Sequence, residues 1–187
     1  GTVLWLLIPE GLMILASKIA HNAGILVSIL GGLLLMGVLL IIPFQQVWFA
    51  RENRFRAFIE IGPVCRLAGR APFKFWLALS LTLVMAVPLF LLKIELTPAE
   101  ITWLPALFFV VFGLPARLMT GWAIGRAEQR EASPNFLLRW FCRVAALGLA
   151  LPFVFGYVVI LFFTQYISWN GTLSLLEQHA LLVPSPF

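Results

Sequence analysis

The chain has 187 residues, of which 61% are apolar and only 11% charged, and it contains no Asp. A soluble domain carries about a quarter charged residues, so the composition excludes a globular fold in water and predicts that lipid surrounds much of the chain. The formal net charge of +5 is typical of basic membrane loops, whereas a nucleic-acid binder usually shows a basic face on a soluble fold. At about 20 residues per span, the length allows four or five spans and no separate soluble domain.

The N-terminal segment, residues 1–20, is apolar but is interrupted by Pro9, Glu10 and Gly11. A carboxylate at the centre of a lipid-facing helix is costly, so a simple crossing is disfavoured. We expect an interfacial or re-entrant helix or half-span here. The alternatives are the later part of a longer span, or a crossing in which Glu10 faces protein.

The first complete span is predicted at residues 24–43, which contain no charge and end at Pro43. Gly24, Ser28 and Gly32 recur every fourth residue and therefore share one face of the helix. Such a ridge of small residues allows another helix to approach closely. It predicts helix packing at this face and says nothing about activity.

A basic segment, residues 44–74, follows this span. Its part from 45 to 62 has aromatic residues on one helical face and charged residues on the other, which predicts an amphipathic helix lying in the membrane interface. Pro63 is expected to end that helix. Contacts with anionic lipid headgroups or a partner are expected from the arginines in this segment, Arg51, Arg54, Arg56, Arg66 and Arg70.

Three further spans are predicted at residues 73–92, 101–122 and 144–166. A second basic segment, 125–143, separates the last two and adds Arg126 and Arg130 to the expected headgroup contacts. In the last span Gly148, Pro152 and Gly156 are four residues apart, a second small-residue ridge. The tail, 167–187, turns at Asn170-Gly171 and is too short to cross again, so we expect it on the surface.

The basic segments predict the topology, because Lys and Arg are enriched in cytoplasmic loops. Both 44–74 and 125–143 should lie in the cytoplasm, in a cell inner or plasma membrane. Cys65 and Cys142 fall in these segments, on the reducing side, where a structural disulfide is not expected. The predicted fold is an all-α bundle of four spans with an N-terminal half-span or interfacial helix and one amphipathic helix.

Ionisable residues within apolar runs are the default functional candidates in a membrane protein, and Glu10 and Arg117 are the two here. Arg117 lies nine residues before Arg126, so its side chain can extend to the headgroup region. Alternatively, it faces the bundle and binds a carboxylate, a lipid phosphate or another anion. Glu10 is a partner for it only if the N-terminal segment reaches the same depth.

Motifs for catalysis are absent from the sequence. His21 and His179 have no carboxylate at a ligand spacing, and no nucleotide, haem or metal motif is present. We therefore expect no cofactor and no metal. The favoured function is that of a non-catalytic subunit or scaffold in a larger membrane complex, with other membrane subunits or a second copy as partner.

Two other functions remain open at the level of sequence. Prolines at 88, 105, 115 and 152 lie in or near spans, and transporters use broken helices to bind ions at mid-depth. This pattern fits a small transporter or channel component with Arg117 in its pathway. A lipid-modifying enzyme would instead place its site at the inner leaflet around Arg117 and Arg126.

Overall fold

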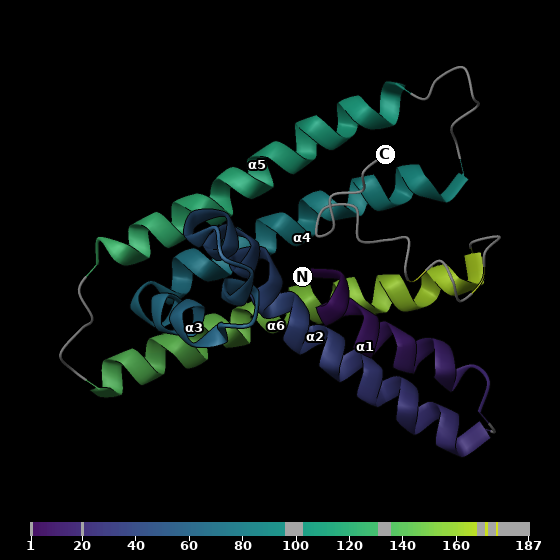
Figure 1. Cartoon of the computed structure of the whole chain (residues 1–187). Coiled ribbons are helices and arrows are strands. Elements are labelled where there is room, and N and C mark those ends of the chain that lie inside the picture. The colour runs from purple at the N-terminus through teal and green to yellow at the C-terminus, as the bar shows by residue number, and fades with distance from the viewer. Residues whose placement is uncertain are drawn as a thin grey trace.

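The computed structural model describes residues 2–19, 21–95, 103–130 and 136–167, together with Gly171 and Leu175. Every regular element in these residues is a helix (Figure 1). The elements in chain order are α1 (Thr2–Ala16), α2 (His21–Glu52), the short 3₁₀ helix η1 (Phe55–Phe58), α3 (Ile61–Arg70), α4 (Pro72–Glu95), α5 (Trp103–Glu128) and α6 (Phe136–Ile167).

Two helical hairpins and α6 make up the bundle. In Figure 1, α1 lies along the first half of α2, and α4 lies beside α5; α6 contacts both α4 and α2. The α1–α2 hairpin is close-packed, since a Cβ at Gly31 would lie 2.9 Å from the carbonyl oxygen of Pro9 and one at Gly24 would lie 2.7 Å from that of Ala16. Glycine is therefore required where α2 meets α1.

The segment after the first span differs from the prediction of one amphipathic helix at 45–62. Helix α2 continues through Pro43 and ends at Glu52, because a proline inside a membrane helix is tolerated when neighbouring groups compensate for the lost hydrogen bond. The chain then turns at Asn53, which has a left-handed φ of 49°. Asn is one of the residues that adopts this conformation readily.

The amphipathic helix of this region is instead α3. It buries Val64, Leu67 and Gly69 and exposes Arg66 and Arg70. Pro63 does not break a helix, because it lies in the first turn of α3, where the missing N–H group costs no internal hydrogen bond. The aromatic face predicted at 45–62 is not part of α3, which contains no aromatic residue, and a position in the membrane interface stays a prediction.

The core lies where α2, α4 and α6 meet. Leu35, Leu39 and Val154 are fully buried there. Large apolar side chains on the outside of the helices are exposed; Leu26 on α2 and Leu118 on α5, for example, are 69% and 63% exposed. Apolar patches of this extent are rare on soluble monomers, and here they match a lipid-facing surface.

Within the described ranges, two helices are long and apolar enough to cross a membrane, namely Asn22–Glu52 and Phe136–Phe163. A third is added if the bent pair Ile61–Arg70 and Pro72–Val87, which meet at 111°, counts as one span. Helix α1 is a shorter apolar helix; its 15 residues extend about 22 Å, less than the roughly 30 Å hydrocarbon core. The all-helical fold is thus confirmed for the described residues, with two to three candidate membrane-spanning helices, and the count of four spans stays a prediction.

Both basic segments lie together at one end of the bundle, which we call the basic end. Arg51 at the end of α2 forms an ion pair with Glu128 at the end of α5. The Lys74 ammonium group of α4 lies 5.3 Å from the Trp122 ring centre of α5. At the opposite end, which we call the far end, α1 turns into α2 near the last turns of α6.

Candidate functional site

Glu10 is 2% exposed and faces the inside of the bundle. Its carboxylate is within electrostatic range of the Tyr157 hydroxyl of α6, which is itself 4% exposed. Glu10 thus faces protein. Helix α1 is a shorter apolar helix, so both the half-span and the crossing in which Glu10 faces protein stay predictions.

Arg117 lies on α5 at a small pocket of about 180 Å³. Pro43 and Gln46 of α2, Thr82 of α4 and Thr120 of α5 also line this pocket. The two threonines are buried, and each hydroxyl donates to a carbonyl of its own helix, Thr82 to Ala78 and Thr120 to Arg117. Because a hydroxyl has one donor, their oxygens can act towards the pocket only as acceptors.

Glu10 and Arg117 lie at different depths of the bundle. Pro9, the neighbour of Glu10, contacts α2 at Gly31, whereas the Arg117 pocket meets α2 at Pro43 and beyond. These positions are 12 residues apart (43 − 31), or about 18 Å along the helix. The depth that a Glu10–Arg117 pair requires is therefore not reached.

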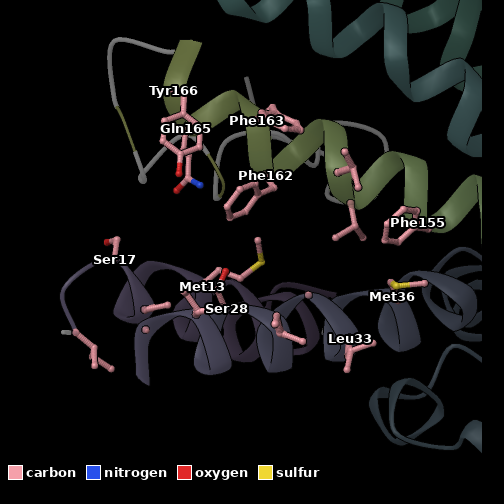
Figure 2. A pocket seen from close by; sticks show the side chains of 18 residues that line it. Met13, Ser17, Ser28, Leu33, Met36, Phe155, Phe162, Phe163, Gln165 and Tyr166 are labelled. Atoms are coloured by element: carbon pink, nitrogen blue, oxygen red, sulfur yellow. The ribbon is translucent and has the colours of Figure 1, made fainter. Parts of the chain in front are cut away.

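A larger pocket than the one at Arg117 is an open groove at the far end, with a volume of about 580 Å³. One wall is formed by the end of α1 and the first half of α2, and the other by the second half of α6 (Figure 2). Its lining residues are mostly apolar: Met13, Ala16, Ser17, Ile19, Gly24, Ile25, Ser28, Ile29, Gly32, Leu33, Met36, Phe155, Val158, Val159, Phe162, Phe163, Gln165 and Tyr166.

The groove has a polar end and an apolar end. Figure 2 shows Ser17 across from Gln165 and Tyr166 at one end, and Met36 and Phe155 at the other. Between them Phe162 points towards Met13. Phe162 stacks edge-on with Tyr166 at 5.9 Å between ring centres, which gives the α6 wall an aromatic surface. Among the described residues, none of those that line this groove is Lys, Arg, Asp or Glu, although the exposed Lys18 stands between the lining residues Ser17 and Ile19.

The two glycines of the small-residue ridge on α2 have different neighbours. Gly24 contacts the backbone of α1, whereas a Cβ at Gly32 would lie 3.8 Å from Val158 of α6, an ordinary van der Waals contact. Gly24, Ser28 and Gly32 all line the groove. Gly31, which the small-residue spacing did not single out, makes the tightest side-chain contact with α1, through Met13.

The ridge of α6 has a different environment. A Cβ at Gly148 or Gly156 would meet no other atom within 4 Å. At 100° per residue, positions 148, 152 and 156 lie on the side of α6 opposite the buried residues Ala150, Val154 and Tyr157. These glycines therefore face outward from the described bundle.

The predicted headgroup arginines are exposed, and several are held by ion pairs. Arg54 pairs with Glu52 at 2.6 Å and Arg56 with Glu60 at 3.4 Å. Exposed pairs of this kind contribute only about 0–1 kcal/mol, so they leave these guanidinium groups accessible to lipid phosphates. Exposed side chains without a described ion pair belong to Arg66 and Arg70 on α3, Arg126 on α5, and Arg130.

Two residues that sequence reasoning missed hold the loop after α2. The buried amide of Gln45 donates to the Ala57 carbonyl, and the Trp5 indole donates to the Phe58 carbonyl at 3.1 Å. Together they tie η1 to α1 and α2. A glutamine within a long apolar helix is a signal for such a partner, because a buried polar group is costly unless it is hydrogen-bonded.

Among the residues that the structure describes, no group of three His, Cys, Asp or Glu side chains is placed to hold a metal ion. Comparison with protein-family models, with curated proteins and with solved structures finds no match to this chain. The function has to be inferred from the surfaces and pockets above.

Proposed function

We propose that this protein is a non-catalytic, multi-pass membrane protein that works by association, as a subunit or scaffold of a larger membrane complex. In this proposal α2, α4, α5 and α6 all cross the bilayer, and the basic end lies in the cytoplasm. The partner is a transmembrane helix of another subunit or of a second copy. The arginines of the basic end contact anionic headgroups and steady the bundle against the inner leaflet.

The outer face of α6 around Gly148, Pro152 and Gly156 is the observation that carries this proposal. Helices associate in lipid through close van der Waals packing at small residues. No other part of the described chain lies within 4 Å of a Cβ at either glycine, so the face is available to an outside helix. Leu149 and Phe153 beside it are 46% and 41% exposed, and a partner would cover them.

Substitution of both glycines by leucine, Gly148→Leu with Gly156→Leu, tests the association. Leucines would hold a partner helix away while meeting no atom of this chain, so the complex should dissociate and the single chain should fold as before. Gly37→Leu is the matched control, because Gly37 on α2 also has no neighbour within 4 Å. Blue native electrophoresis of gently solubilised membranes reads the result; a complex unchanged in the double variant would overturn the proposal.

A transporter or channel component is the second candidate, and the Arg117 pocket favours it. A guanidinium group beside Gln46 and two buried threonines is a polar site within an apolar bundle, and such sites mark ion or substrate pathways. The test is flux of small anions into liposomes containing the purified chain. Transport that is lost in Arg117→Gln and kept in Arg126→Gln would favour this function over the scaffold.

A further inference from the structure

The far-end groove has the length of one bilayer leaflet. Along α2 it extends from Gly24 to Met36, and along α6 from Phe155 to Tyr166. At 1.5 Å per residue these are about 18 Å and 16 Å, close to half of the roughly 30 Å hydrocarbon core. An occupant that fills the groove therefore reaches from the far-end surface to about the middle of the membrane.

The floor of the groove is closed by the bundle core. Leu35 and Leu39, which lie around its end on α2, are fully buried, as is Val154 at its end on α6. A partner helix that crosses the whole bilayer cannot continue along this path. The groove therefore suits an occupant about one leaflet long.

The polar end of the groove fits a phospholipid head. The Ser17 hydroxyl donates to the Ile14 carbonyl at 2.7 Å, so its oxygen can only accept towards the groove. The Gln165 amide and the Tyr166 hydroxyl offer donors as well as acceptors, and Tyr166 is 72% exposed at the mouth. Ester carbonyls would accept from these donors. Lys18, which is exposed between the lining residues Ser17 and Ile19, adds a positive charge at this end that suits the phosphate of the head.

We propose that the groove binds one acyl chain of a phospholipid, taken from the leaflet at the far end. The chain lies between Phe162 and Met13 and ends near Met36 and Phe155, while the glycerol esters lie beside Gln165 and Tyr166. The groove adjoins the outer face of α6 at which the partner helix is proposed to bind, because Val159 and Phe163 of its wall continue that face. Lipid retention and complex mass are separate measurements, so either proposal can fail alone.

Native mass spectrometry of the delipidated full chain with added phosphatidylethanolamine or phosphatidylglycerol measures the site. We expect one tightly held phosphatidylethanolamine, and at least about tenfold weaker retention in Ser28→Trp, where the indole fills the groove from the α2 wall. Leu26→Trp is the control, because Leu26 is on the same helix, is 69% exposed and does not line the groove. Phosphatidylglycerol should lose retention in Ser28→Trp in the same proportion, because the acyl chain and not the headgroup fills the groove.

A photoreactive benzoylphenylalanine at Phe162 gives a second readout that does not depend on how Ser28→Trp folds. In native membranes it should form an adduct with the mass of a phospholipid. Cross-linking to a peptide of another protein, or to residues 176–187 of the same chain, would overturn the proposal. So would equal retention of phosphatidylethanolamine in the wild type and in Ser28→Trp, or retention by neither.

Discussion

Gly31 shows how much a single position decides in this fold. A Cβ there would lie 2.8 Å from Cγ of Met13 and 2.9 Å from the Pro9 carbonyl oxygen. The second contact is with backbone, which cannot rotate away as a side chain can. The α1–α2 hairpin, and with it the burial of Glu10, depends on the absence of a side chain at Gly31.

Gly31→Ala should therefore destabilise the protein by about 1–3 kcal/mol, the usual cost of overpacking. Gly37→Ala on the same helix is the control, and it should be neutral or slightly stabilising, since nothing lies within 4 Å and alanine favours helix. Thermal unfolding in a fixed detergent or nanodisc measures both. Equal melting temperatures for the two variants would contradict the close hairpin packing.

Trp5→Phe removes the hydrogen bond to the Phe58 carbonyl and keeps most of the apolar contact. The expected loss is about 1 kcal/mol, together with faster proteolysis of the chain between Asn53 and Glu60, which this bond holds. Trp140→Phe is the control, because Trp140 is 58% exposed on α6 and has no described hydrogen bond. Identical cleavage rates in the wild type and Trp5→Phe would show that the bond does not hold the loop.

The residue scale also shows where sequence reasoning stops. Glu10 and Arg117 can be identified from the sequence, because a charged residue within an apolar run stands out whatever the fold. The sequence does not identify Tyr157, Gln45 or Gly31, because their roles depend on contacts between elements that are distant in the chain. The local sequence shows that a polar group would be costly to bury, but it does not show which partner would compensate for that cost.

At the scale of elements, the apolar runs predicted the long helices and failed at their ends. Pro43 was read as the end of a span, but α2 continues to Glu52. The next residue, Asn53, has a left-handed φ and turns the chain. Proline constrains the chain locally, whereas packing of α2 against α4 and α5 supports the helix beyond it.

The contact between the ends of α2 and α5 gives a prediction about these elements. With Arg51→Cys and Glu128→Cys in a background without Cys65 and Cys142, a short bismaleimide should link the two helices, because these side chains meet in an ion pair. Leu26→Cys with Glu128→Cys should not be linked, since position 26 lies 25 residues (51 − 26) or about 38 Å along α2 from Arg51. Peptide mass analysis identifies the link, and equal linking in both pairs would contradict the arrangement.

At the scale of the molecule, the bundle has two different ends. Arg51, Lys74 and Glu128 lie at the basic end, and the mostly apolar groove opens at the far end. In the proposed topology the basic end lies in the cytoplasm, as expected from the enrichment of Lys and Arg on that side.

Cys65 tests this sidedness, because it is exposed on α3 at the basic end. In a Cys142→Ser background, a membrane-impermeant maleimide should label Cys65 in inverted vesicles and leave it unlabelled in intact cells. Detergent-permeabilised cells give the value for full labelling. Labelling in intact cells equal to that after permeabilisation would reverse the proposed topology.

The central claim, that the protein works by association, is tested most directly by its mass in native lipid. The chain has a mass of 20.9 kDa. Extracted into polymer nanodiscs without detergent and weighed by native mass spectrometry, it should be found with at least one further protein chain, of its own kind or another. A mass corresponding to a single chain with lipid alone would contradict the proposed function.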